Sequence, residues 1–574
     1  MPTRGETRGL RPHACRPAAA RLRLRLLLVA ALLLVGCGSA APTPLPTATG
    51  DRTAPTNAAT PAVGCATTSI SSAPPVPGRA AWQARTFYEV FVRSFADSGR
   101  DGIGDLRGLT ARLDRLAGPD GLGVGGLWLL PIMPSPSYHG YDVTDYEAIR
   151  PEYGTLDDLR ALVAAAHQRG LKVILDLPIN HTSDRHPWFQ DSRRPGSAHA
   201  DWYVWSATPP SGPNWYPAGS RWYYATFGPQ MPDLNLREPA VTAALVDAAR
   251  FWLTQGGVDG FRLDAAKALI EDGPRTENTP ETKAWLAAFT AALHATQPEA
   301  LVLGEVWDVS DVSAAYVPSD LDMTFDFGLA SAERLAVESE LAGGLASALA
   351  DSMARYPAGG QGTFLANHDM DRLASDLGGD PAKLRLAAAL LLTGPGIPFL
   401  YYGEEIGMSG AKPDERIRTP MRWDASAPAA GFSAAAPWEP LSDDPATVNV
   451  AAEAADPASL WSWYRQLIGL RNSHAALATG GYLPVRARGD SVLAELRAAG
   501  TERLLVVANL AGQPVVDYGL DLAAGPLCDV RAASLVLGTG AVAAPAVTAG
   551  GGFAAYRPLA VLPARSVIVV ALRP

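Results

Sequence analysis

Residues 155–181 read TLDDLRALVAAAHQRGLKVILDLPINH and show the unit from which the fold is built. Thr155, with Asp158 three residues later, predicts a helix start, because each side chain can bond the other residue's backbone N–H. Apolar residues then recur at helical spacing up to Gly170, a residue type that commonly ends helices. The apolar run 171–177 follows as a buried strand. The stretch therefore predicts one helix-strand unit of a parallel sheet.

The same alternation continues along most of the chain from Phe87 onward. Eight β-rich runs predict strands, at residues 87–91, 126–130, 171–177, 258–263, 301–304, 323–327, 363–366 and 398–402. Eight parallel strands with helices between them imply an α/β fold, a closed (β/α)8 TIM barrel whose chemistry gathers at the carboxyl ends of the strands. Several runs end there in polar clusters, at 176–181, Asp264, Glu305 and 367–369.

Two parts of the chain depart from this pattern. Residues 180–237 are too many for a plain connection and predict a small inserted domain, domain B. After a final helix around 460–471, short alternating runs such as 503–509 and 566–572 predict a C-terminal all-β sandwich over 481–574. The barrel is therefore expected over 79–179 and 238–480.

The N-terminal sequence predicts an export signal. An apolar run at 26–35 follows Arg16, Arg21, Arg23 and Arg25, and it is shorter than the roughly 20 residues that cross a bilayer, so residues 1–37 predict a signal peptide. Leu34-Val35-Gly36-Cys37 resembles the lipobox of bacterial lipoproteins and implies a lipid on Cys37. An ordinary signal peptide that contains Cys37 is the alternative. The resemblance implies a protein anchored to the outer face of the bacterial cell membrane.

Residues 38–78 are mostly Ala, Pro, Thr, Ser and Gly and predict a disordered tether. Of the four cysteines, Cys15 lies in the signal region and Cys37 is the expected lipid carrier, which leaves Cys65 and Cys528 as candidates for one disulfide.

The net charge argues against one class of binding partner. With 48 basic and 58 acidic side chains the net charge is -10, which argues against nucleic acid, because phosphate contacts need clustered Lys and Arg. No obligate protein partner is evident in the sequence.

Arg262 and Asp264 form the first candidate pair for catalysis. They stand two residues apart on a predicted strand, so both side chains leave the same face. A guanidinium beside a carboxylate favours the ionised form, which a nucleophile needs. A structural ion pair in the barrel interior is the alternative interpretation.

Glu305 and Asp369 complete a set of three acids. Glu305 follows an apolar strand, where burial and nearby carboxylates would raise its pKa and keep the proton that a general acid needs. In the Asn-His-Asp motif at 367–369, His368 and Asp369 can hydrogen-bond bound hydroxyls. Two carboxylates that straddle a glycosidic bond can hydrolyse it, and a third can bind and distort the sugar.

Five segments resemble the signature regions of the α-amylase family, glycoside hydrolase family 13, in their expected order. They are Asp-Leu-Pro-Ile-Asn-His at 176–181, Met-Pro-Asp-Leu-Asn at 231–235, Phe-Arg-Leu-Asp at 261–264, Gly-Glu-Val-Trp at 304–307 and Asn-His-Asp at 367–369. The resemblance extends from about Trp82 to the C-terminus. It implies a retaining double displacement on α-linked glucan, with Asp264 as nucleophile, Glu305 as acid/base and Asp369 as transition-state stabiliser.

The resemblance also implies the residues that bind substrate. His181, Arg262 and His368 would line the sugar subsite next to the scissile bond. In Tyr138-His-Gly-Tyr-Asp142, Tyr141 would stack on that sugar and Asp142 would lie near its hydroxyls, a buried aromatic under the loop being the alternative for Tyr141. Arg418 matches an arginine that binds the same ring, and Lys267 matches a lysine that holds sugar beyond the cleavage point.

A calcium site is predicted near the first strand. Asp97-Ser-Gly-Arg-Asp101-Gly-Ile-Gly-Asp105 places three carboxylates in a glycine-containing turn, the pattern by which a loop wraps a hard cation. It resembles a calcium loop of part of the family, and the expected Ca²⁺ ligands are Asp97, Asp101, Ile103 and Asp105. A solvated acidic turn without metal is the alternative. A second family calcium site uses a residue matching Asn180, and its other ligands are not identified.

The expected substrate is an α-1,4-glucan such as starch, maltodextrin or a related malto-oligosaccharide. Ala265 stands where enzymes of α-1,6 bonds commonly have valine, whereas Ala268 replaces a histidine that often follows the lysine. Met231 to Asn235 resembles a branch between oligo-1,6-glucosidase and neopullulanase groups. An α-glucosidase, neopullulanase-like or transglycosylating enzyme is the first alternative. A non-catalytic glucan-binding surface lipoprotein is the second, although such proteins typically lose acids that this chain keeps.

Overall fold

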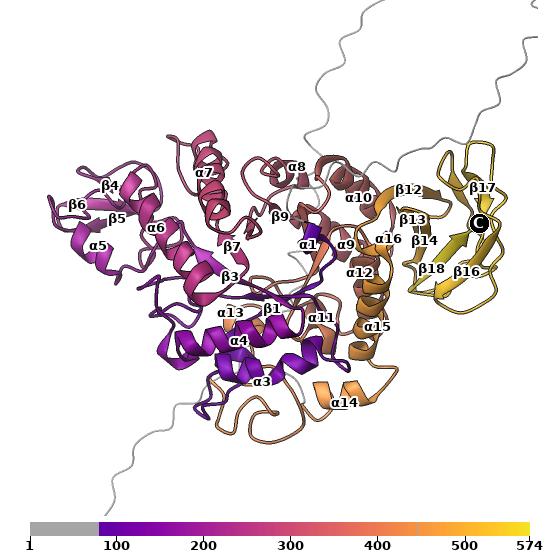
Figure 1. The fold of residues 1–574 in the computed structure, drawn as a ribbon, viewed down its shortest axis with the longest axis horizontal. Coiled ribbons are helices and arrows are strands. Elements are labelled where there is room, and N and C mark those ends of the chain that lie inside the picture. Colours follow the sequence, from indigo (N-terminus) through magenta and orange to yellow (C-terminus); the bar gives the residue numbers. More distant parts are fainter. Residues whose placement is uncertain (1–79, 443–444) are drawn as a thin grey trace, which may run out of the picture. The chain divides into compact units, whose positions relative to one another are not determined.

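The computed structural model describes residues 80–442 and 445–574 (Figure 1). The predicted signal peptide and tether, with Cys15, Cys37 and Cys65, lie outside the described residues. Within these two ranges, no helix combines the length and the apolar character needed to cross a membrane.

Eight parallel strands close into a barrel, which confirms the predicted fold class. In sequence they are β1 (Phe87–Val90), β2 (Gly126–Leu129), β3 (Lys172–Pro178), β7 (Gly260–Asp264), β8 (Leu301–Gly304), β9 (Met323–Phe325), β10 (Gln361–Phe364) and β11 (Ile397–Tyr401). Each strand pairs with the next along this order, and β11 pairs with β1. The register sets Asp176 of β3 beside Arg262 of β7, so residues far apart in sequence reach the same level of the barrel.

Aromatic side chains fill the barrel interior. The Phe87 and Phe399 rings stack with centroids 4.6 Å apart, and Phe325 packs against both Phe399 and Trp128. A Cβ atom at Gly126 would lie 2.5 Å from the Phe87 ring, so β2 needs a glycine where it passes that ring. Since side chains alternate along a strand, Glu89 points to the same interior as Phe87.

Helices alternate with the strands, as predicted. The longer ones are α3 (Leu106–Ala117), α4 (Leu156–Gln168), α6 (Pro239–Phe251), α7 (Pro280–Thr296), α9 (Phe327–Ser339), α10 (Gly343–Arg355), α12 (Pro381–Thr393) and α15 (Leu460–Ser473). The Thr155–Asp158 capping box is present: the Asp158 N–H bonds Thr155 Oγ1 at 3.3 Å, and the Thr155 N–H bonds Asp158 Oδ2 at 2.9 Å.

Short helical segments complete the connections. They are α1 (Ala80–Gln83), α2 (Val92–Phe95), η1 (Pro151–Tyr153), the π-helical turn η2 (Trp252–Gly256), α8 (Ser310–Ala314), α11 (Leu373–Asp376), η3 (Glu404–Ile406), α13 (Asp414–Ile417), α14 (Val450–Ala455) and α16 (Ala475–Ala478).

The insertion between β3 and α6 contains a small antiparallel sheet. The insertion begins with helix α5 (Pro187–Ser192). Its sheet consists of β4 (Trp205–Ser206), β5 (Trp215–Ala218) and β6 (Arg221–Tyr224), in the order β4-β6-β5. Phe189 of α5 packs against the rings of Tyr203 and Tyr223, each with centroids 5.0 Å away. These rings form the core of the insertion, whereas Phe227 is 38 % exposed at its edge.

Seven antiparallel strands form the C-terminal part, which confirms the predicted all-β domain. They are β12 (Gly481–Ala487), β13 (Val492–Ala499), β14 (Glu502–Asn509), β15 (Leu520–Leu522), β16 (Ala532–Leu537), β17 (Phe553–Tyr556) and β18 (Ser566–Arg573). They hydrogen-bond in one order, β16-β18-β14-β13-β12-β15-β17, as a half-barrel around a core of its own. Cys528 in this domain is disulfide-bonded, and Cys65, the partner that the sequence suggests, lies outside the described residues.

Candidate active site

The three predicted acids line one pocket at the carboxyl ends of the barrel strands. Asp264 is the last residue of β7, Glu305 follows β8, and Asp369 lies in the loop after β10. The pocket has a volume of about 540 Å³, and Tyr141, His181 and Arg418 are among its other lining residues. The fold thus brings together side chains that are separated by more than two hundred residues in the chain.

Arg262 connects three carboxylates beneath this pocket. Its Nη1 lies 2.8 Å from Asp176 Oδ1 and 2.6 Å from Asp264 Oδ1, and its Nη2 lies 2.8 Å from Glu305 Oε1. Only 1 % of the Arg262 side chain is exposed, so the guanidinium is buried with its acidic partners. Asp264 and Glu305 are therefore held within the width of a single guanidinium.

Asp176 supports the pocket from β3. Its Oδ2 accepts hydrogen bonds from the Tyr141 hydroxyl at 3.0 Å and from Trp128 Nε1 at 3.2 Å. Burial raises the pKa of Asp176 to about 6, and Arg262 opposes this rise. Asp176 opens the motif 176–181, but its position in the motif alone did not identify it as a partner of Arg262.

Glu305 has the environment of a proton donor. Burial, with Asp264 and Asp369 adding to it and Arg262 opposing it, raises the pKa of Glu305 to about 7. Its Oε2 also accepts a hydrogen bond of 3.2 Å from the backbone N–H of Ala265. Ala265 has φ of 49°, in the left-handed region, and this local strain coincides with the N–H that contacts Glu305.

His368 and Asp369 form a second charged group at the pocket. His368 Nε2 lies 3.0 Å from Asp369 Oδ2 and 2.7 Å from the Tyr141 hydroxyl, and Arg418 Nη2 lies 2.7 Å from Asp369 Oδ1. Although burial opposes it, the charges of His368 and Arg418 hold the pKa of Asp369 well below its usual range. Asp369 is therefore ionised at neutral pH.

Asp414 is a pocket residue that the sequence analysis does not identify. Arg418 Nη2 lies 3.2 Å from its Oδ2 atom.

His181 lines the pocket beside the insertion. Its Nδ1 lies 3.2 Å from Asn180 Oδ1, and its ring is 5.3 Å from that of Phe227. The His181 Nε2 atom is buried and makes no hydrogen bond with the residues that the structure describes. A hydroxyl of a bound sugar can provide the missing partner.

Four predicted substrate-binding residues do not line the pocket: Arg262 and His368, which lie beneath it, and Lys267 and Asp142. Lys267 Nζ contacts Glu277 Oε2 at 2.9 Å and the Trp307 carbonyl at 3.2 Å, and it lies 4.7 Å from the Trp307 ring centroid. Since Trp307 does line the pocket, Lys267 stands directly behind its wall. Asp142 is buried, and its Oδ1 accepts hydrogen bonds from the hydroxyls of Ser135 and Ser137.

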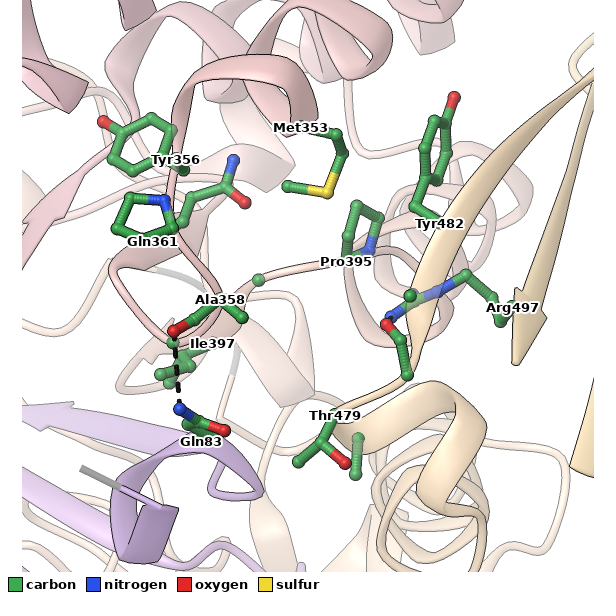
Figure 2. Close-up of a pocket in the computed structure, with 16 residues that line it drawn as sticks. Gln83, Met353, Tyr356, Ala358, Gln361, Pro395, Ile397, Thr479, Tyr482 and Arg497 are labelled. Carbon is green, nitrogen blue, oxygen red and sulfur yellow. Dashed lines mark hydrogen bonds between the residues drawn. The ribbon is translucent and has the colours of Figure 1, made fainter. Parts of the chain in front are cut away.

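A second cavity, of about 110 Å³, lies at the amino ends of β10 and β11, where the C-terminal domain meets the barrel (Figure 2). Gln83, Gln361, Tyr482 and Arg497 are among its lining residues, and no acidic side chain is. Arg497 Nη1 donates to the Thr393 carbonyl at 3.0 Å, which ties β13 to the end of α12. This cavity is a junction between domains and lacks the acids that glycosidic cleavage needs.

The predicted calcium loop gathers its carboxylates around Gly99. A Cβ atom there would lie 3.5 Å from Asp97 Oδ1, 3.8 Å from Asp105 Oδ2 and 3.9 Å from Asp101 Cγ. None of the three acids pairs with a Lys or Arg of the described chain. Asp97 and Asp105 instead accept backbone N–H bonds, from Gly102 at 2.8 Å and Gly99 at 3.1 Å. These hard oxygen donors suit Ca²⁺ chemically, although no cluster of three acidic, His or Cys side chains in the described ranges already has the spacing of a metal site.

Comparison with known proteins identifies relatives over most of the folded chain. Residues 89–480 match the α-amylase catalytic domain. An α-amylase of Dictyoglomus thermophilum is 40 % identical over 445 residues, covering 74 % of this chain and 84 % of the relative. A trehalose synthase/amylase of Mycolicibacterium smegmatis is 37 % identical over 502 residues, covering 75 % of this chain and 84 % of the relative. The crystal structure of an α-amylase from H. orenii superposes with a TM-score of 0.74 at 37 % identity, covering 86 % of this chain and all of that one.

Proposed function

Because the chain belongs to the α-amylase family, we propose that it is a retaining hydrolase of α-1,4-glucosidic bonds in starch, maltodextrins and related oligosaccharides. One observation carries the proposal: a single buried guanidinium, that of Arg262, contacts both Asp264 and Glu305. Retaining glycosidases place their two carboxyl groups about 5–5.5 Å apart, and a shared guanidinium keeps two carboxyl groups close in this way.

In the first step, Glu305 gives its proton to the glycosidic oxygen while Asp264 attacks the anomeric carbon. The bond to the leaving sugar breaks, and a covalent glycosyl-Asp264 intermediate forms. Glu305 is suited to this role because its raised pKa keeps it protonated below about pH 7. Asp264 is suited because Arg262 Nη1, 2.6 Å away, stabilises its negative charge.

In the second step, Glu305 acts as a base. It takes a proton from water, the water oxygen attacks the anomeric carbon, and the bond to Asp264 breaks, which restores the carboxylate and the α-configuration. Asp369 stays ionised beside His368 and Arg418, so its negative charge can stabilise the positive charge that develops on the sugar ring. The Nε2 atom of His181, which has no hydrogen-bond partner among the described residues, and the ring of Tyr141 complete the proposed subsite.

A second candidate is transfer of the glucosyl group to another sugar, since one relative carries the name trehalose synthase/amylase. The first step would be unchanged, and a sugar hydroxyl would replace water in the second. Phe227 and Trp307, whose ring centroids are 6.3 Å apart at the pocket wall, offer aromatic faces on which an acceptor sugar can pack.

We also propose that Ca²⁺ binds Asp97, Asp101, Asp105 and Ile103, as the loop resemblance implies. The proposed role of the ion is structural, because the loop leads into α3, whose first turn is capped by Asp105. The ion would offset the mutual repulsion of the three carboxylates and hold this turn in one conformation.

The proposed location is the outer face of the cell membrane, through a lipid on Cys37. This part of the proposal depends on the apolar run and the lipobox-like segment of the sequence. Mass spectrometry of the mature protein tests it: a diacylglycerol-modified Cys37 at the new N-terminus supports the anchor. A mature chain that begins elsewhere, with an unmodified terminus, rejects it.

Product analysis on amylose, maltotriose, maltose and pullulan tests the catalytic proposal. Hydrolysis of amylose and maltotriose to shorter malto-oligosaccharides is expected. Conversion of maltose to trehalose without net hydrolysis would support the transfer reaction instead, and cleavage of only the α-1,6 bonds of pullulan would assign the other linkage.

A further inference from the structure

Glu89 is a buried acid in an otherwise apolar strand. β1 reads Phe-Tyr-Glu-Val, and Glu89 is 1 % exposed. In the described part of the chain its only ion-pair partner is His368. An ionised carboxylate in an apolar interior is costly unless it is paired and hydrogen-bonded, so this contact decides whether the residue is tolerated there.

The contact between Glu89 and His368 is short and isolated from solvent. Glu89 Oε1 lies 2.6 Å from His368 Nδ1, and it also accepts the backbone N–H of His368 at 3.3 Å. The His368 side chain has no exposed surface. In the barrel β11 lies between β1 and β10, so the two side chains meet in the interior, one layer above the Phe87 ring.

The opposite ring nitrogen of His368 contacts two residues that line the pocket. Nε2 lies 3.0 Å from Asp369 Oδ2 and 2.7 Å from the Tyr141 hydroxyl. The Tyr141 hydroxyl in turn donates to Asp176, which pairs with Arg262. A continuous line of contacts therefore runs from Glu89 through His368 and Tyr141 to the cation that holds Asp264 and Glu305.

We infer that Glu89 is a positioning residue, which keeps a proton on both ring nitrogens of His368 so that the Nε2–H group is a permanent donor at the pocket. With this donor fixed, Tyr141 accepts from His368 and keeps its own proton for Asp176, while Asp369 stays ionised and oriented. A His368 ring that lost one proton could donate from only one nitrogen, so it would lose either the bond from Nδ1 to Glu89 or the donor at Nε2. The expected effect of Glu89 on turnover rests on the proposed function, whereas its expected effect on the protonation of His368 does not.

The charges around the ring agree with this assignment. Glu89 faces it from β1, Asp369 from its own loop, Asp176 from β3 and Glu305 from the end of β8, while Arg418 Nε donates to the His368 carbonyl at 2.8 Å. Although burial opposes it, Asp369 and Glu89 raise the pKa of His368 to about 10.

The test compares the full chain with Glu89→Gln and with Glu405→Gln as a matched control. Glu405 is also buried and accepts the Tyr88 hydroxyl at 2.7 Å, but His368 is not among its contacts. Selective ¹⁵N labelling of histidine follows the His368 imidazole across pH, and its signal is assigned as the one that disappears in His368→Gln. In the wild type and in Glu405→Gln, His368 is expected to remain doubly protonated from pH 5.5 to 8.5, whereas in Glu89→Gln it is expected to titrate inside that range.

Turnover of amylose gives the second readout. Relative to the wild type at the same pH, the kcat of Glu89→Gln is expected to be at least tenfold lower at pH 8.5 but less than threefold lower at pH 5.5, with KM little changed. The reason is that each unit by which the His368 pKa falls reduces the protonated form about tenfold at a pH above that pKa. A wild-type His368 that titrates between pH 5.5 and 8.5 overturns the inference, and this holds even if Glu89→Gln does not fold. An equal fall in kcat at every pH overturns it as well, since that is the effect of a merely structural residue. A wild type inactive on every glucan rejects the proposed function and leaves the NMR comparison valid.

Discussion

Arg262 Nη2 lies 2.8 Å from Glu305 Oε1, so the proposed acid/base and the proposed nucleophile Asp264 share one buried cation. The shared cation has two effects. It stabilises the ionised nucleophile, and it limits how far burial raises the pKa of Glu305. The relative positions of the two carboxyl groups therefore depend on a planar group with several donors, which a single ammonium cannot replace.

Replacing Arg262 by lysine is expected to lower kcat/KM on amylose by about 100-fold or more, because a small displacement of reacting groups is enough for such a loss. Lysine keeps the charge but cannot contact Asp176, Asp264 and Glu305 together. Steady-state kinetics measures the effect. Arg250→Lys is the control, since Arg250 is 44 % exposed and pairs with Asp247 on the surface. Equal activity of the two variants would show that the bridging geometry does not matter.

The pH dependence should report on Glu305. Its pKa of about 7 predicts that kcat/KM falls as pH rises above about 7, because the ionised carboxylate has no proton to give to the leaving group. The profile on a malto-oligosaccharide measures this limb. Glu305→Gln should keep some activity on α-glucosyl fluoride, because the fluoride leaving group needs no protonation. That remaining activity should not fall as the pH rises above about 7. A wild-type profile that stays flat to pH 9 would contradict the assignment of Glu305.

Removing the nucleophile should abolish turnover without unfolding the chain. Asp264→Asn is expected to lose starch hydrolysis by several orders of magnitude, since an amide cannot form the glycosyl intermediate. Asp311→Asn is the control, because its ion pair with Arg355 is exposed and such pairs contribute at most about 1 kcal/mol. Activity assays are read beside circular dichroism. Near-normal turnover of a folded Asp264→Asn would reject its role.

Chelation tests the calcium proposal. Treatment with EDTA is expected to lower the Tm by several degrees, because a ligand that binds only the folded state stabilises it. Asp97→Asn should have a lower Tm at the outset and show a much smaller response to EDTA. Differential scanning fluorimetry with and without added Ca²⁺ measures both. If the Tm of the wild type is the same with EDTA and with Ca²⁺, the loop is a solvated acidic turn.

The barrel was predictable because each strand is a local apolar run. The segment 171–177 was expected as a strand and is found as Lys172–Pro178, and the capping box at Thr155 sets the start of α4. The three acids could also be found, because each stands at or after the end of such a run. The hydrogen-bonded order of the C-terminal strands could not be predicted from the sequence, because it depends on pairings between distant segments, such as β12 with β15.

The supporting contacts of the site were not predictable for the same reason. Glu89 and His368 are 279 positions apart, and their contact exists only once β1 and β10 enter the same closed barrel. An acid inside the apolar run 87–91 was the available signal, because a buried charge needs a partner. Lys267 was expected beyond the cleavage point, yet its contacts with Glu277 and Trp307 depend on loops whose course no periodicity predicts.

The central claim is retaining cleavage of α-1,4-glucan through Asp264 and Glu305, and the anomeric form of the first product tests it most directly. Proton NMR of maltohexaose during the first minutes of hydrolysis distinguishes the α- from the β-anomer before they equilibrate. The proposal predicts that the newly formed reducing ends appear as α-anomers, and that they are absent with Asp264→Asn. New reducing ends that appear first as β-anomers would contradict the retaining mechanism.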